Sequence, residues 1–127
     1  MSTEKSLQQT VEASCSRLEE IALSMGVTLS KSSASVPNLQ EIILSLLDIK
    51  ADESTLNGAT FMIGTYLGEI LRAKLGGYWQ NSAHNELLLI VGETSYSPVA
   101  KVRKFSANPK GGDDLAFFAN AVLSHDL

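Results

Sequence analysis

Cysteine and histidine are nearly absent from this chain of 127 residues. The single cysteine, Cys15, cannot form an intramolecular disulfide bond or a site of several cysteines, and only His84 and His125 carry imidazole groups. These counts exclude zinc fingers, disulfide-rich scaffolds, iron–sulfur proteins and histidine-rich metal sites, and we expect no cofactor and no metal. Because no histidine or basic residue is tied to Cys15 by sequence, we interpret it as a small buried hydrophobe.

Long apolar runs are missing as well. The run Leu87–Val91 falls far below the roughly 20 residues that a membrane span requires. The segment that follows Lys5 is polar, unlike the apolar centre of a signal peptide. With one cysteine and no visible export signal, the sequence predicts a cytoplasmic protein without a membrane partner.

The sequence also lacks an excess of positive charge. The net charge is −4, and residues 1–53 carry eight acidic and four basic residues, whereas residues 54–127 are balanced. A nucleic-acid binder usually shows a dominant basic footprint. The one basic concentration lies within residues 101–110, and we interpret it as a solvated helix face. We therefore expect no nucleic-acid partner, and an acidic N-terminal part that attracts a basic protein.

What is present is helical periodicity in the first three-fifths of the chain. Apolar residues recur at steps of three, four or seven, and capping residues mark where each segment begins and ends. The first helix ends at Gly26, and the second begins at Pro37 and ends near Ile49 or Lys50. The third runs from a cap at Asp52 or Ser54 to Leu75. The third is apolar over so much of its circumference that we expect it to be the central helix.

The periodicity changes after the glycine pair at 76–77. Residues 78–80 and 86–91 read as strands, and a short third strand is expected to begin at Tyr96. The segment 98–106 is predicted to be a helix, with a strand as the alternative, and Asp113 is predicted to cap a last helix. The sequence thus predicts one α+β domain over residues 1–127. It has three N-terminal helices, a small antiparallel sheet of two or three strands and two short C-terminal helices.

Two glycines lie one turn apart on the predicted central helix. Gly64 and Gly68 each cost about 1 kcal/mol relative to alanine inside a helix, so a close contact with a neighbouring element should compensate. We expect Gly68→Leu to overpack this contact by about 1–3 kcal/mol or more. An alanine at the same position is expected to be much milder.

Five residues are candidates for a binding site: Tyr66, Glu69, Arg72, Trp79 and Lys101. Glu69 precedes Arg72 by three positions, which suits an ion pair along the helix. Alternatively, it is a partly buried carboxylate that pairs with Lys101 or Lys104 at the mouth of a groove. Trp79 either anchors the core or contacts a partner. No catalytic serine motif, phosphate-binding loop or metal-binding motif is present, so we name no catalytic residue and expect a binding role rather than catalysis.

The central part of the chain resembles a family of small uncharacterised bacterial proteins. The resemblance rests on Tyr66–Glu69, Leu75–Gly77 and Trp79, and it continues through Pro98–Val102 in the pattern Y-L-G-E…L-G-G-x-W…P-x-x-K-V. A final helix that begins near Gly112 completes it, so it covers roughly residues 60–120. These motifs are mostly architectural, and the resemblance implies a fold and a bacterial origin without an activity.

Three functions remain open from the sequence. The first is a small acidic protein-binding module, for instance an immunity-type inhibitor, that acts by occupying a partner. The second is a small-molecule binding protein or enzyme, with a pocket between the central helix and the sheet lined by Glu69, Tyr66, Arg72 and Lys101. The third is a structural subunit that self-associates, for instance as a homodimer, through its sheet edges.

Overall fold

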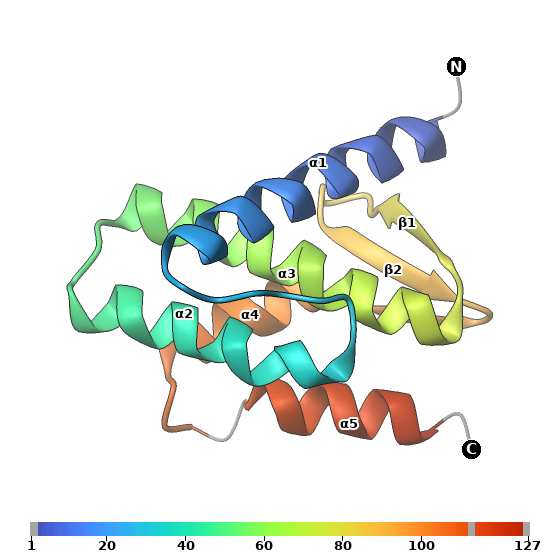
Figure 1. Ribbon diagram of the computed structural model, residues 1–127. Helices are drawn as coiled ribbons and strands as arrows, with labels where there is room; N and C mark the ends of the chain where they lie inside the picture. The colour runs from blue at the N-terminus through green and yellow to red at the C-terminus, as the bar shows by residue number, and fades with distance from the viewer. Residues whose placement is uncertain (1–2, 112–113, 126–127) are drawn as a thin grey trace.

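The computed structural model describes residues 3–111 and 114–125, and in them the chain forms an α+β fold (Figure 1). Three helices come first, a three-stranded antiparallel sheet follows, and two helices end the described chain, in the predicted order. None of the helices in these described residues is long and apolar enough to cross a membrane. The elements are α1 (Thr3–Ser24), the 3₁₀ turn η1 (Ser33–Ser35), α2 (Val36–Asp48), α3 (Glu53–Leu75), β1 (Tyr78–Asn81), β2 (Leu87–Val91), β3 (Thr94–Tyr96), α4 (Pro98–Ala107) and α5 (Leu115–His125).

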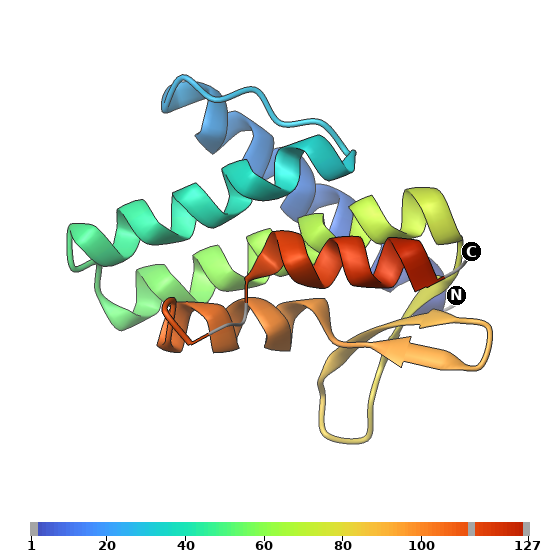
Figure 2. The same cartoon turned by 90° about the horizontal axis from the view of Figure 1, so that it is seen from below.

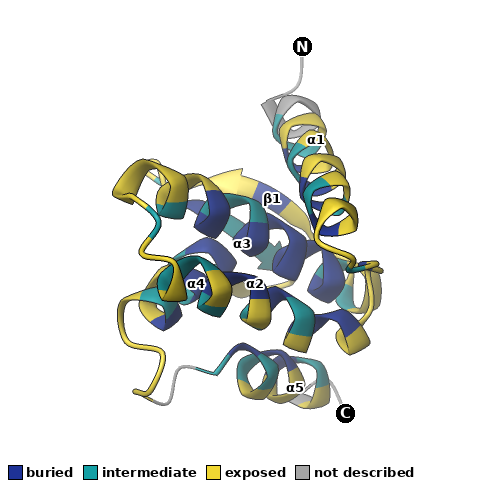
Figure 3. Ribbon diagram, turned by 60° about the vertical axis from the view of Figure 1, so that its left-hand side comes forward, coloured by how far each residue is buried: buried dark blue, intermediate teal, exposed yellow. Residues whose placement is uncertain are grey.

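Helix α3 is the centre of the molecule, as its wide apolar arc predicts. It contacts all four other helices, with α1 and α4 on different sides of it (Figures 1 and 2). Every residue from Ile63 to Leu71 is buried, so this stretch has no solvent-facing side (Figure 3). A helix enclosed all round is consistent with its apolar composition.

The helix boundaries follow the capping residues. The side chain of Asp52 accepts a hydrogen bond from the backbone N–H of Thr55 at 2.8 Å, and Pro37 lies in the first turn of α2. Asp113, the predicted cap of the last helix, lies outside the described residues. Within them, the carboxylate of Asp114 accepts the N–H of Phe117, and the side-chain oxygen of Gln40 accepts the N–H of Leu115. Gln40 therefore ties the start of α5 to α2.

The sheet has the strand order β1-β2-β3, with Trp79 opposite Leu89 and Leu89 opposite Tyr96. Its third strand ends at Tyr96 rather than beginning there, because the turn after β2 takes only two residues. The segment from Pro98 is helix α4, so the strand alternative for this segment was wrong. The helix buries Val99, Val102 and Phe105 on one face, and this spacing suits a helix and not a strand.

Gly64 and Gly68 both lie in close contacts. A Cβ on Gly64 would lie 2.5 Å from the Cα of Val99, so the backbone of α4 crosses here as predicted. A Cβ on Gly68 would lie 2.1 Å from the edge of the Trp79 ring. The space next to Gly68 is therefore filled by a large side chain and not by a neighbouring backbone. These distances argue against a mild effect of alanine at Gly68, because even a Cβ would overlap the ring.

Candidate functional site

Glu69 is the centre of a buried hydrogen-bond cluster that joins three elements. Its carboxylate accepts from Nε1 of Trp79 at 2.9 Å, from Nε of Arg72 at 2.7 Å and from Nε2 of Gln8 at 3.4 Å. The side chain is 6% exposed, and that of Arg72 is 33% exposed. The ion pair along the helix was predicted correctly. The pairing with Lys101 or Lys104 was wrong, because the carboxylate is occupied by donors from α1, α3 and β1.

The protonation of Glu69 follows from these donors. Burial by itself would raise the pKa of the carboxyl, but the hydrogen bonds from Arg72 and Trp79 and the charge of Arg72 outweigh burial and hold the pKa below its ordinary value. Glu69 is thus an ionised acceptor with several donors around it at neutral pH. Such a carboxylate is suited to holding α1, α3 and β1 together and poorly suited to proton transfer.

Tyr66 lies one turn before Glu69 and belongs to the interface of α1 with α3. It is fully buried, and its hydroxyl donates to the carboxylate of Glu19 at 2.7 Å. Burial and the neighbouring Glu19 raise the pKa of the Tyr66 hydroxyl above its ordinary range. Ser14 and Thr65 share a hydrogen bond of 2.9 Å at the same interface. These pairs bind the two helices to each other, so the hydroxyl groups of these pairs are engaged within the protein.

Lys101 lies apart from the other four predicted residues. Its ammonium lies 5.5 Å from the ring centre of Phe118 on α5, in a cation–π arrangement. It lines a small surface pocket with Tyr96 and Lys104. The structure therefore brings Glu69, Arg72 and Trp79 together, places Tyr66 in a neighbouring pair, and separates Lys101 from them. Of the five, Tyr66, Glu69 and Trp79 are buried.

Cys15 is fully buried beside this interface, as predicted for a small hydrophobe. Burial raises the pKa of its thiol to about 11, although Lys31 acts in the opposite direction. Because the thiolate is the reactive form, we expect the folded protein at pH 8 to react with a disulfide reagent at least about a hundredfold more slowly than the unfolded protein. Absorbance of the released thiol measures both rates. Equal rates in buffer and in guanidinium chloride would show that the thiol is accessible in the native state.

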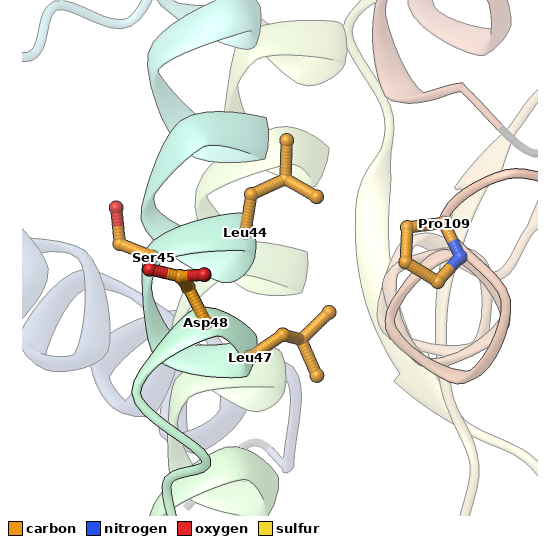
Figure 4. A pocket seen from close by; sticks show the side chains of 5 residues that line it. All are labelled: Leu44, Ser45, Leu47, Asp48 and Pro109. Atoms are coloured by element: carbon orange, nitrogen blue, oxygen red, sulfur yellow. The ribbon is translucent and has the colours of Figure 1, made fainter.

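A surface hollow lies on α2, away from the five residues predicted for a site. It is a shallow groove of about 520 Å³, lined by Leu44, Ser45, Leu47, Asp48 and Pro109. Figure 4 shows Leu44 and Leu47 projecting from α2 toward Pro109, which lies in the loop after α4, whereas Ser45 and Asp48 lie along the helix. The groove thus has apolar walls from two segments that are far apart in the sequence.

The groove residue Asp48 belongs to an acidic corner, which is the set of exposed charged residues between positions 41 and 53 on α2, in the turn after it and at the start of α3. Ile49, which directly follows α2, is 72% exposed, the same fraction as Phe117 on α5. Thr55 holds the pKa of the Asp52 carboxyl below its ordinary value, so this residue stays charged. The exposed charges between residues 41 and 53 are four acids and one base: Glu41, Asp48, Asp52, Glu53 and Lys50.

Only part of this surface has a signal in the sequence. The acidic excess of residues 1–53 is visible there, but Leu47 reads as part of the buried stripe of its helix and is only partly buried. Pro109 reads as a loop residue with no link to α2. No three His, Cys, Asp or Glu side chains in the part of the chain that the structure describes lie close enough to hold a metal ion.

Comparisons of the chain with protein-family models, with curated proteins and with solved structures give no match. The resemblance to small bacterial proteins therefore stays a prediction.

Proposed function

We propose that this protein is a small acidic protein-binding module that acts by occupying a basic partner, in the manner of an immunity-type inhibitor. The observation that supports the proposal most is the groove on α2, in which Leu44 and Leu47 form apolar walls beside the acidic corner. Interfaces combine an apolar centre with a polar rim, and opposite charges speed association.

The shape of the groove favours a macromolecular partner over a small ligand. Small-molecule sites enclose most of their ligand, whereas this groove is shallow and open along α2. Its exposed apolar neighbour Ile49 would be covered when a partner docks, and burial of such a side chain contributes about 1.5–3 kcal/mol. The buried cluster around Glu69 supports this function only indirectly, because it holds the scaffold rigid.

Two charge-reversal proteins test the proposal. One carries Glu41→Lys and Asp48→Lys, two exposed positions on α2 of which Asp48 lines the groove, and its control carries Glu20→Lys and Glu93→Lys, which are exposed on α1 and in the turn after β2. Both have the same net charge, so overall electrostatics cannot distinguish them. We expect the wild-type protein and the control to retain one basic protein from a lysate of the native host, and the groove variant to lose it.

The captured protein must also behave as an occupied partner. Its own activity should fall when the wild-type module is added in equal amount, and its retention should weaken with salt. Equal capture by both charge variants would place the interface elsewhere. Recovery of further copies of this chain and of nothing else would instead indicate a self-associating subunit.

A further inference from the structure

A second cleft, of about 330 Å³, lies where α3, α4 and the β1–β2 turn meet. Phe61, Leu87 and Val99 give it apolar walls, and Val99 and Leu87 are buried. The polar side chains His84, Asn85, Glu86 and Arg103 complete the lining. The volume is at the lower end of the range for small-molecule sites, which also combine apolar walls with a few polar groups. The cleft shares no residue with the groove on α2.

The turn that carries three of these side chains is held in place by Ser82. The hydroxyl oxygen of Ser82 accepts the backbone N–H groups of His84 and Glu86, both at 3.1 Å, and its carbonyl oxygen accepts that of Asn85 at 3.0 Å. Asn85 has a φ of 59°, a left-handed conformation that asparagine tolerates better than most residues. These bonds hold the backbone of the turn in one conformation, which lowers the backbone part of the ordering cost of binding.

The two full charges of the cleft have opposite signs and come from different segments. Arg103 is on α4 and Glu86 is in the turn before β2. Among the described residues, neither side chain forms an ion pair or hydrogen bond with the other or with a third residue. A guanidinium group binds carboxylates in a bidentate manner, and a carboxylate accepts hydrogen bonds from an ammonium group.

We propose that this cleft binds a small zwitterion, namely a free α-amino acid with an apolar side chain. Its carboxylate pairs with Arg103, its ammonium group pairs with Glu86, and its side chain lies against Phe61, Leu87 and Val99. A purely anionic ligand would leave Glu86 facing a like charge, and a purely cationic one would do the same to Arg103. The zwitterion uses both charges and the apolar wall together.

Calorimetric titration with L-leucine and L-phenylalanine tests this site, with two blocked analogues as controls. N-acetyl-L-leucine lacks the ammonium charge, and L-leucinamide lacks the carboxylate. We expect the free amino acids to bind with a Kd of about 1 mM or tighter, and each blocked form to bind at least about tenfold more weakly.

Substitutions assign the contacts. Arg103→Gln and Glu86→Gln should each weaken L-leucine binding by about tenfold or more, whereas Arg17→Gln, an exposed arginine on α1, should leave it unchanged. Both cleft residues are exposed, so the variants should fold, and equal melting temperatures verify this.

Three results would overturn the site. The first is no heat of binding, together with no shift of the Phe61 or Leu87 NMR resonances, at about 10 mM amino acid. The second is equal affinity for L-leucine and a blocked analogue. The third is an unchanged affinity for L-leucine in Arg103→Gln. Equal affinity for N-acetyl-L-leucine would mark a plain anion site. Because the cleft and the groove share no residue, none of these results bears on the protein-binding proposal.

Discussion

Gly68→Ala should lower the free energy of unfolding by at least about 2 kcal/mol, and Gly68→Leu by more. The new Cβ would lie 2.1 Å and 2.5 Å from two carbons of the Trp79 ring, and the ring is held by its hydrogen bond to Glu69. A shift of the ring away from α3 would therefore strain or break this bond. The gain of about 1 kcal/mol in helix propensity offsets a part of the clash and not all of it. Denaturant titration followed by circular dichroism measures the loss.

Gly58→Ala is the matched control on the same helix. Nothing lies within 4 Å of a Cβ at Gly58, so this substitution should raise the free energy of unfolding by up to about 1 kcal/mol through helix propensity alone. The two alanine substitutions are therefore expected to have opposite signs. If Gly68→Ala is neutral or stabilising, the packing of Trp79 against α3 is not as described.

Glu69→Ala should destabilise the protein by about 2–4 kcal/mol. The substitution leaves the buried indole N–H of Trp79 without its acceptor and removes the counter-charge of Arg72, and breaking a buried pair in this way costs about 3–5 kcal/mol when both partners are fully buried. Arg72 is partly exposed and can be hydrated, which reduces the loss. Glu20→Ala, at an exposed position on α1, should change the free energy of unfolding by less than about 0.5 kcal/mol.

The pH dependence of stability separates the charge of Glu69 from its shape. Because its folded pKa is below the ordinary value of 4.5, its contribution is complete above pH 4.5 and is lost as the pH falls through the folded pKa. Glu69→Gln should flatten stability against pH in that acid range. Asp52 and Asp114 also have lowered pKa values, but the wild-type protein and Glu69→Gln both retain these two residues. The difference between their stability curves therefore reports the charge of Glu69. Parallel stability curves for the wild-type protein and Glu69→Gln would contradict the assignment of Glu69 as ionised in the folded protein.

The helices could be predicted because each one is marked by local chemistry. Asp52 and Pro37 lie at helix starts, Gly76 follows the end of α3, and the apolar spacing runs between these marks. Strand β3 was misplaced since it has three residues, of which only Tyr96 is apolar. Its existence depends on pairing with β2, and a pattern along the chain does not record that pairing.

The candidate sites were predicted less well, because most of their contacts join distant segments. Glu69 and Arg72 are three positions apart on one helix, so their pairing could be read directly from the sequence. The contact of Glu69 with Trp79 depends on how the turn at Gly76 and Gly77 reverses the chain, so that β1 lies beside α3. The placement of Pro109 across the groove from Leu47 depends on the path of α4, which spacing along the chain does not encode.

Trp79 has a consequence for spectroscopy as well as for stability. It is the only tryptophan of the chain, it is 2% exposed, and its indole N–H donates to a carboxylate that also binds donors from α1 and α3. Its emission therefore arises from one dry location and not from an average over the molecule. Separation of β1 from α1 and α3 would expose the indole ring to water and change the wavelength and intensity of that emission, so the protein carries a built-in optical probe of this junction.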